Sequence, residues 1–308
     1  METLDKSWPP RAISEAGATS SCTFQEAGLV PRASSSTHST STDNPIPQPN
    51  SNLINTSTPV KLSNRFRNCG TNALLQCIVA TELLKVQVLS WSNGYRAIQK
   101  AIYHVVAPMA NGNEPAPMKL TYCHTEVRHL VPCAARGDVH QLWEALATSV
   151  FGVTTKVILG VPESARCSNC ETGNTTVHLH SMPVPHDEVD VQAAMKEFTL
   201  SHRCAGCGRG YQNRGTIGAP QVLVVRRHGA AISMPTTVVI NDRDMYKLCA
   251  ILDHENNHYT AFVAVNEVVF WCNDETITRK DAWPVCHAVL AFYVKCRVAV
   301  DEPAAPTP

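Results

Sequence analysis

The chain has 308 residues, of which 44% are hydrophobic, and its 26 lysine and arginine residues balance 26 aspartate and glutamate residues. This length and composition are sufficient for a globular core. The neutral charge gives no electrostatic reason to expect nucleic acid or an anionic membrane as the main partner. The sequence has no apolar run long enough to span a bilayer and no recognisable secretory signal. We therefore expect an intracellular protein, cytoplasmic or nuclear rather than secreted.

The expected location restricts the roles of the 13 cysteines. A reducing compartment does not sustain a disulfide framework, and an odd number of cysteines cannot pair completely. We therefore expect some cysteines to be metal ligands or a reactive thiol, and the others to be small buried apolar residues.

Two terminal segments have the composition of disordered chain. Residues 1–58 are rich in serine, threonine and proline without sustained apolar periodicity, and residues 301–308 are similar. Such segments cannot bury enough apolar surface to offset the loss of conformational entropy on folding. We predict two tails around a folded region that covers residues 59–300.

Apolar periodicity and turn residues predict the elements between the tails. Residues 69–84 are expected to form a buried helix, because apolar side chains cover most of its circumference. Further helices are predicted at 95–107, 138–151 and 190–198, with Asp138 and Asp190 as N-caps of the last two. Strands are predicted at 153–161 and 221–227, and a hairpin at 259–272 with its turn at Asn266-Glu267. Helices first and strands later indicate an α+β fold.

Two CxxC motifs indicate a zinc site. Cys167 and Cys170 form the first motif, and Cys204 and Cys207 form the second, with 33 residues between the inner cysteines. A CxxC turn directs two thiolates at one point, so that two such turns complete a tetrahedral zinc shell. Four unrelated buried thiols are the alternative. Zinc bound in this way would be structural and would not by itself indicate an activity.

Cys69 has the position expected of a nucleophile. It directly precedes the predicted buried helix, whose positive end and free amide groups favour a thiolate. Asn64, five residues upstream, could donate its side-chain amide to a developing oxyanion. The alternatives are a buried core cysteine and an ordinary turn asparagine.

A cysteine nucleophile needs a base, and the base needs an orienting partner. His258 opens the first strand of the predicted hairpin, and Asn273-Asp274 closes the second. With a two-residue turn at Asn266-Glu267, His258 and Asn273 share one face as diagonal neighbours, and Asp274 falls on the other face. Asn273 is thus the predicted orienting residue, with Asp274 in support. One additional loop residue would exchange the two.

These segments together resemble the ubiquitin-specific protease family. Around Cys69, the positions occupied by Asn64, Asn72, Leu75 and Gln76 are those that carry asparagine, asparagine, leucine and glutamine in the family's cysteine box. The run from His258 to Phe262, HYTAF, resembles its histidine box. The segment from Trp271 to Asp274 resembles the one that supplies the third triad member, and the two CxxC motifs resemble its zinc-bearing fingers.

The resemblance implies a papain-like cysteine peptidase over residues 59–300. The thumb would cover about 60–150, the zinc-bearing fingers about 160–215 and the palm about 216–300. The implied reaction is hydrolysis of the peptide or isopeptide bond after the C-terminal glycine of ubiquitin, with ubiquitin or polyubiquitin conjugates as partners. Cys69 would be the nucleophile, His258 the base and Asn64 an oxyanion donor, and structural zinc would be the cofactor.

The sequence departs from the family pattern in three places. Residues 66–68 are Phe-Arg-Asn where Gly-Asn-Thr is usual, Gly70 replaces an aromatic residue, and Asn257 replaces the glycine before the histidine. These changes concern the walls of the expected substrate channel more than the triad. Three alternatives stay open: an inactive ubiquitin-binding scaffold, a peptidase for a ubiquitin-like modifier, and a zinc-stabilised interaction module unrelated to ubiquitin.

Overall fold

The computed structural model describes residues 58–64, 68–93, 96–131, 138–159, 175–185, 188–203, 210–227 and 229–296. All of them belong to one compact unit. The two predicted tails therefore lie outside the described residues, except for Thr58.

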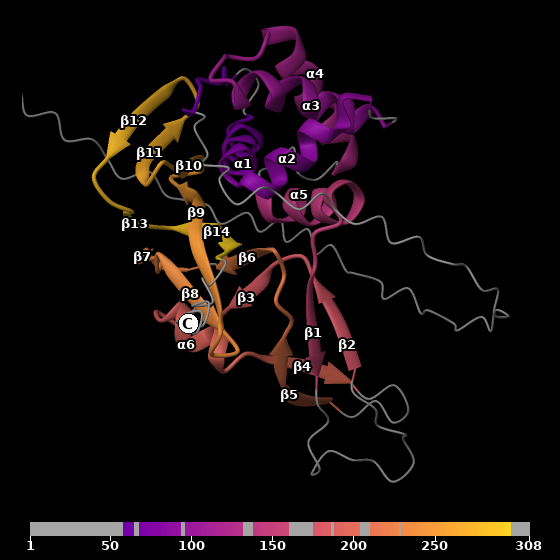
Figure 1. Cartoon of the computed structure of the whole chain (residues 1–308), viewed down its shortest axis with the longest axis vertical. Helices are drawn as coiled ribbons and strands as arrows, with labels where there is room; N and C mark the ends of the chain where they lie inside the picture. The colour runs from indigo at the N-terminus through magenta and orange to yellow at the C-terminus, as the bar shows by residue number, and fades with distance from the viewer. Residues whose placement is uncertain are drawn as a thin grey trace, which may run out of the picture. The chain divides into compact units, whose positions relative to one another are not determined.

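Helices dominate the N-terminal part of the described chain (Figure 1). They are α1 (Cys69–Ala80), α2 (Glu82–Leu89), the 3₁₀ turn η1 (Ser90–Asn93), α3 (Ala97–Ala110), α4 (Pro117–Leu130), α5 (Val139–Leu146) and the π turn η3 (Ala147–Phe151). One further short helix, α6 (Val191–Lys196), lies among the strands.

The first predicted helix is in fact two helices. Thr81 between α1 and α2 has extended dihedral angles, and its hydroxyl donates to the carbonyl of Cys77 at 2.8 Å. A threonine that bonds back to the preceding turn in this way competes with the helical ladder and bends the helix.

In the described part of the chain no single helix is long and apolar enough to cross a membrane. The segments Cys69–Ala80 and Glu82–Asn93 reach the required length and hydropathy only when they are taken together, and the chain bends by 96° between them.

Strands form three sheets. The eight-stranded sheet comprises, in spatial order, β12 (Thr276–Lys280), β11 (Val268–Asn273), β10 (His258–Val265), β9 (Asp244–Glu255), β14 (Ala288–Lys295), β6 (Val222–Arg227) and β3 (Met182–Val184), with β8 (Thr237–Ile240) also paired to β9. The four-stranded sheet has the order β2 (Thr175–Leu179), β1 (Thr155–Leu159), β5 (Gly210–Ile217) and β4 (Thr199–Arg203). The strands β7 (Ile232–Ser233) and β13 (Val285–Cys286) form a separate pair.

The eight-stranded sheet separates two apolar cores. On β6, Val222 and Val224 join the core that contains α1 to α5, and Leu223 and Val225 join the core that contains α6. Successive side chains of a strand point to opposite faces, so that a strand covered on both faces needs apolar residues at every position. This requirement explains the uninterrupted apolar run of β6.

Most of the predicted elements are confirmed. The predicted helix 95–107 corresponds to α3, and 138–151 to α5 with η3. Asp138 and Asp190 accept hydrogen bonds from the second and third backbone N–H groups after them, as N-caps do. The strands β1 and β6 and the hairpin β10–β11 lie where they were predicted. Helix α4 was not predicted. The mixture of helices and sheets agrees with the expected α+β class.

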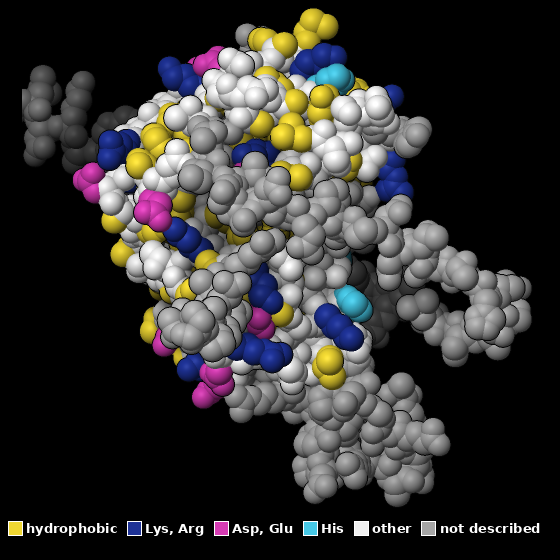
Figure 2. Space-filling model, viewed as in Figure 1, with side chains coloured by type: hydrophobic (Ala, Val, Ile, Leu, Met, Phe, Trp, Pro, Cys, Tyr) yellow, Lys and Arg dark blue, Asp and Glu magenta, His cyan; other side chains and the backbone are white. Residues whose placement is uncertain are grey.

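Figure 2 shows where the charged side chains of the described residues lie on one face. Lysine and arginine occur over both halves of the view, whereas aspartate and glutamate lie on its left half, beside some of these basic side chains.

Candidate active site

The N-terminus of α1 presents Cys69 together with free helix-end amides. Asn68 is the N-cap residue, but its side chain makes no capping hydrogen bond with α1. Its Oδ1 instead accepts a hydrogen bond of 2.8 Å from Arg128 of α4. An uncapped helix start leaves N–H groups directed outward, and the helix dipole adds positive potential there. Both effects stabilise negative charge on a thiolate or an oxyanion beside Cys69.

Close packing fixes this helix start against two other elements. A side-chain carbon at Gly70 would lie 2.8 Å from Cγ2 of Val139 in α5 and 3.4 Å from Cδ2 of Tyr259 in β10. No larger residue fits there without movement of its neighbours. The contact explains why glycine suits this position, where the family that the sequence resembles usually has an aromatic residue.

Two tight turns place His258 at the same end of the sheet as Cys69. Strands β9 and β10 are joined by Asn256-Asn257, and β10 and β11 by Asn266-Glu267, and all four turn residues have φ between 49° and 67°. These are the dihedral angles of type I′ turns, which match the twist of paired strands. The pairing of Val265 with Val268 confirms the predicted register. Helix α1 packs directly on β10.

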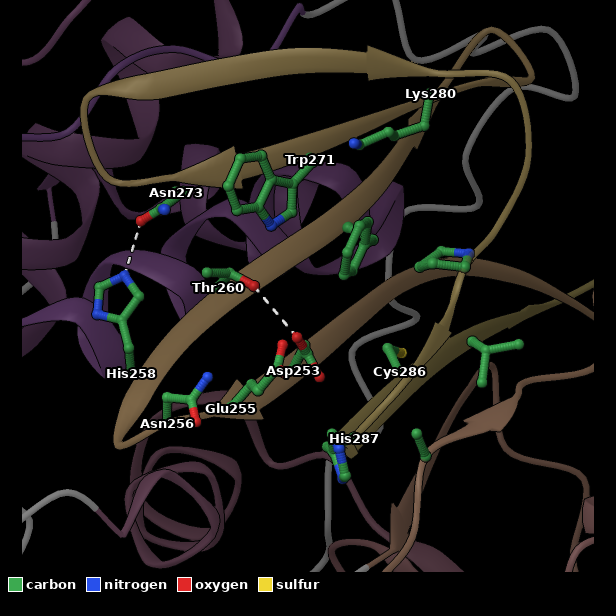
Figure 3. A pocket seen from close by; sticks show the side chains of 14 residues that line it. Asp253, Glu255, Asn256, His258, Thr260, Trp271, Asn273, Lys280, Cys286 and His287 are labelled. Carbon is green, nitrogen blue, oxygen red and sulfur yellow. Dashed lines mark hydrogen bonds between the residues drawn. The ribbon is translucent and has the colours of Figure 1, made fainter.

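His258 bonds to Asn273 and lies near Asp274. Its Nε2 is 2.7 Å from Oδ1 of Asn273 (Figure 3). The same nitrogen is 3.7 Å from Oδ2 of Asp274. Two acceptor oxygens on this side favour the tautomer with the proton on Nε2. Nδ1 then keeps its lone pair and can accept a proton.

The placement predicted for Asp274 is wrong. Strand β11 ends at Asn273, and Asp274 has a φ of 48°, so that the alternation of faces stops one residue earlier than expected. The left-handed conformation turns the carboxylate toward the same side as His258 and the start of α1. Asp274 is therefore a second neighbour of the imidazole.

Two asparagines of the predicted cysteine box hold the Asp274 carboxylate. Nδ2 of Asn64 donates to Oδ2 and Nδ2 of Asn72 donates to Oδ1, each at 2.8 Å. Oδ1 of Asn64 accepts the backbone N–H of Asn68 at 2.7 Å. The side-chain amide that was predicted as an oxyanion donor is thus bonded to Asp274 in the structure.

Sequence reasoning missed His124 of α4, which completes this group. Its Nε2 is 2.9 Å from Oδ1 of Asn72, and its side chain is buried. Burial and the neighbouring Arg128 lower the pKa of His124 to about 4, so that the imidazole is neutral at pH 7. The signal was present in the sequence, since Leu120, Cys123, His124 and Val127 follow the spacing of a buried helix face.

The other buried thiols are poor nucleophiles. Burial raises the pKa of Cys123, Cys249, Cys272 and Cys286 to about 12, and that of Cys77 well above its usual value. These thiols stay protonated at neutral pH, and the thiolate is the reactive form. Cys69 is partly exposed and lies at a helix start.

A cavity of about 550 Å³ opens beside His258 and Asn273. Thr260, Phe262 and Trp271 line it from the same hairpin, and Figure 3 shows Cys286 and His287 on its far side. The buried carboxylate of Asp253 also lies in this wall, where burial raises its pKa. The cavity can accommodate a polypeptide segment next to the imidazole.

Some of the predicted site is not brought together. No hydrogen bond joins Cys69 to His258, although both residues are described. Catalytic hydrogen bonds are often long without a substrate and shorten in the substrate complex. The four cysteines of the predicted zinc site, Cys167, Cys170, Cys204 and Cys207, lie outside the described residues. Within the described ranges no group of three or more histidine, cysteine, aspartate or glutamate residues could hold a metal ion.

Comparisons with known proteins find similar folds. No family model and no curated protein matches the sequence. A chain of the SAGA DUB module of Ubp8, Sgf11, Sus1 and Sgf73 bound to monoubiquitin is 16% identical, with a TM-score of 0.60 over 80% of this chain and 71% of that chain. The same module bound to ubiquitin aldehyde gives 15% identity and a TM-score of 0.59 over 80% and 71% of the two chains. A further structure of the module gives 14% identity and a TM-score of 0.58 over 79% of this chain and 69% of that chain. The protein therefore has a fold like that of this deubiquitinase module.

Proposed function

We propose that the protein is a thiol-dependent deubiquitinase of the ubiquitin-specific protease type. The supporting observation is the meeting of the Cys69 helix start with the strand that begins at His258, whose imidazole bonds to Asn273. Sequence motifs and fold similarity point in the same direction, and two of the three similar structures contain ubiquitin or ubiquitin aldehyde.

In the proposed reaction, Nδ1 of His258 takes the proton of the Cys69 thiol. The thiolate attacks the carbonyl carbon of the C-terminal glycine of ubiquitin, and the amides at the start of α1, together with Asn64, stabilise the oxyanion. The intermediate collapses to a thioester as His258 returns the proton to the leaving amine. A water molecule, deprotonated by the same imidazole, then releases ubiquitin and restores the thiol. The cavity beside His258 gives the leaving polypeptide a place to lie.

The proposal includes one structural zinc ion held by Cys167, Cys170, Cys204 and Cys207. The first CxxC motif lies between β1 and β2, and the second between β4 and β5. The end of β1 pairs with Gly215 of β5 in antiparallel register, so that both connections leave the same end of the four-stranded sheet. Two thiolate pairs at one end of a sheet suit a shared tetrahedral metal.

The test is covalent labelling by ubiquitin that carries a C-terminal thiol-reactive group. We expect one adduct per chain on Cys69, its loss in Cys69→Ala, and hydrolysis of a ubiquitin amide by the wild-type protein but not by His258→Ala. Cys286→Ala is the matched control and should still be labelled. Labelling that persists in Cys69→Ala would show that another residue is the nucleophile.

A ubiquitin-binding scaffold without turnover is the second candidate. The observation that favours it is the missing hydrogen bond between Cys69 and His258. It predicts measurable affinity for ubiquitin with no adduct and no hydrolysis, so that the same experiment separates the two functions.

A further inference from the structure

The donor directions around Asp274 are fixed by chemistry. A carboxylate only accepts hydrogen bonds, so Asn72 must turn its NH₂ group toward Asp274 at 2.8 Å. The carbonyl oxygen of Asn72 then faces His124, 2.9 Å away, and His124 must donate from Nε2. The hydrogen bond from His124 thereby determines which way the Asn72 amide points.

The chain of hydrogen bonds crosses three elements. It runs from His124 in α4 to Asn72 in α1, and from Asn72 to Asp274 at the end of β11. Oδ2 of Asp274 lies 3.7 Å from Nε2 of His258. A change at His124 can therefore reach the imidazole through two intervening side chains.

Burial makes this chain rigid. The residues His124 and Asn72 are 5% and 2% exposed, so that water cannot replace a lost hydrogen bond on either. Without the donor on His124, the Asn72 carbonyl is left unpaired in a buried site, and only the bonds from Nδ2 to Asp274 at 2.8 Å and to the Ser63 carbonyl at 3.4 Å hold the amide. The Asn72 side chain is then free to shift, and Asn64 is left as the one fixed donor to Asp274 of the pair.

We infer that His124 is a positioning residue for the proposed active site, which acts by holding the Asp274 carboxylate in place through Asn72. Asn273 fixes the tautomer of His258, and the carboxylate, 3.7 Å from Nε2, then stabilises the imidazolium that forms when His258 accepts the thiol proton. The kinetic part of this inference rests on the proposed deubiquitinase function.

The kinetic test compares two donor-free variants with one that keeps the donor. His124→Phe and His124→Leu should lower kcat for a ubiquitin amide about 5-fold and leave KM unchanged. This factor corresponds to the loss of one hydrogen bond of about 1 kcal/mol. His124→Gln, whose amide can donate near the position of Nε2, should restore kcat. Cys123→Ala is the matched control, since Cys123 is a buried neighbour on α4 outside the chain of hydrogen bonds. It should lose stability but not kcat.

A double-mutant comparison tests the route. In the Asp274→Ala background, His124→Phe should cause no further loss of kcat, because the group through which it acts is gone. An additional full loss in that background, or equal kcat for the Phe, Leu and Gln variants and the wild type, would overturn the inference.

A second readout needs no ubiquitin. We expect iodoacetamide to alkylate Cys69 more slowly at pH 7 in His124→Phe than in the wild type, and at the wild-type rate in His124→Gln, as measured by peptide mass mapping. If the wild type does not cleave ubiquitin but this pattern holds, the proposed function fails and the positioning role stands. If the wild type cleaves ubiquitin and the alkylation rates are equal, the positioning role fails.

Discussion

The imidazole of His258 has two candidate partners with different chemistry. Asn273 is close and neutral, at 2.7 Å, whereas Asp274 is charged but lies at 3.7 Å. A neutral carbonyl is sufficient to fix the tautomer, and a cysteine enzyme can form its thiolate before attack. The charge of Asp274 is shared among His258, Asn64 and Asn72.

We expect Asn273→Ala to lower kcat about 100-fold, because the direct hydrogen bond that orients the base is lost. Asp274→Ala should lower kcat about 10-fold, because it releases the neighbouring asparagines without removing that bond. Both rates are measured by ubiquitin-amide hydrolysis at saturating substrate. A much larger loss in Asp274→Ala than in Asn273→Ala would exchange the two roles.

The neutral state of His124 gives the fold a pH dependence. The pKa of this residue is about 4 in the folded protein, below its unfolded value, so that the unfolded chain binds more protons between these two values. The free energy of unfolding should therefore fall as the pH drops from about 6.5 to about 4, by about 3 kcal/mol from this residue alone.

Urea unfolding of the wild type and His124→Gln across this pH range isolates the effect. Burial raises the pKa of Asp253, which acts in the opposite direction, but that contribution is common to both proteins and cancels in the difference. A pH-independent difference would contradict the assignment of His124 as buried and neutral.

At the scale of elements, the turn between β9 and β10 leads directly into His258, the proposed base. Asn257 has a φ of 60° and immediately precedes His258. This conformation suits glycine and is tolerated by asparagine, which explains how the chain departs from the family pattern here without losing the turn.

We expect Asn257→Gly to keep the wild-type stability and kcat. Asn257→Val should lower the free energy of unfolding by about 1–2 kcal/mol and reduce kcat, because a β-branched residue is strained in the left-handed region. Urea unfolding and ubiquitin-amide hydrolysis measure the two effects. Equal behaviour of the Gly and Val variants would show that the turn conformation does not position His258.

The local sequence was sufficient for elements with a strong period or a clear cap. Asp138, Asp190 and the β10–β11 register could be predicted because each depends on neighbours in the chain. Helix α4 was not predicted because His124 occupies a core position, so that the buried face of the helix lacks a continuous apolar pattern. The carboxylate of Asp274 was misplaced because strand alternation cannot indicate where β11 ends, and its partners Asn64 and Asn72 lie some 200 residues earlier.

At the scale of the whole molecule, the predicted zinc ion would stabilise the four-stranded sheet. We expect one zinc per chain in purified protein, and unchanged stoichiometry in Cys286→Ala. Cys204→Ser should lower the zinc content. It should also lower the free energy of unfolding by several kcal/mol, since structural zinc binding is coupled to folding. Elemental analysis and thermal unfolding measure these effects. Zinc near zero in reduced wild-type protein prepared without chelator would contradict the site.

The position of β14 determines when the protein can fold during its synthesis. This strand is the last element in the described chain, yet it lies between β9 and β6 in the middle of the eight-stranded sheet. During synthesis, the edges of β9 and β6 that pair with β14 stay unpaired until residues 288–295 have left the ribosomal exit tunnel. Unpaired apolar edges of this kind are templates for aggregation. A stop shortly before Ala288 would therefore yield a chain that carries both Cys69 and His258 but lacks the strand that joins the two halves of the sheet.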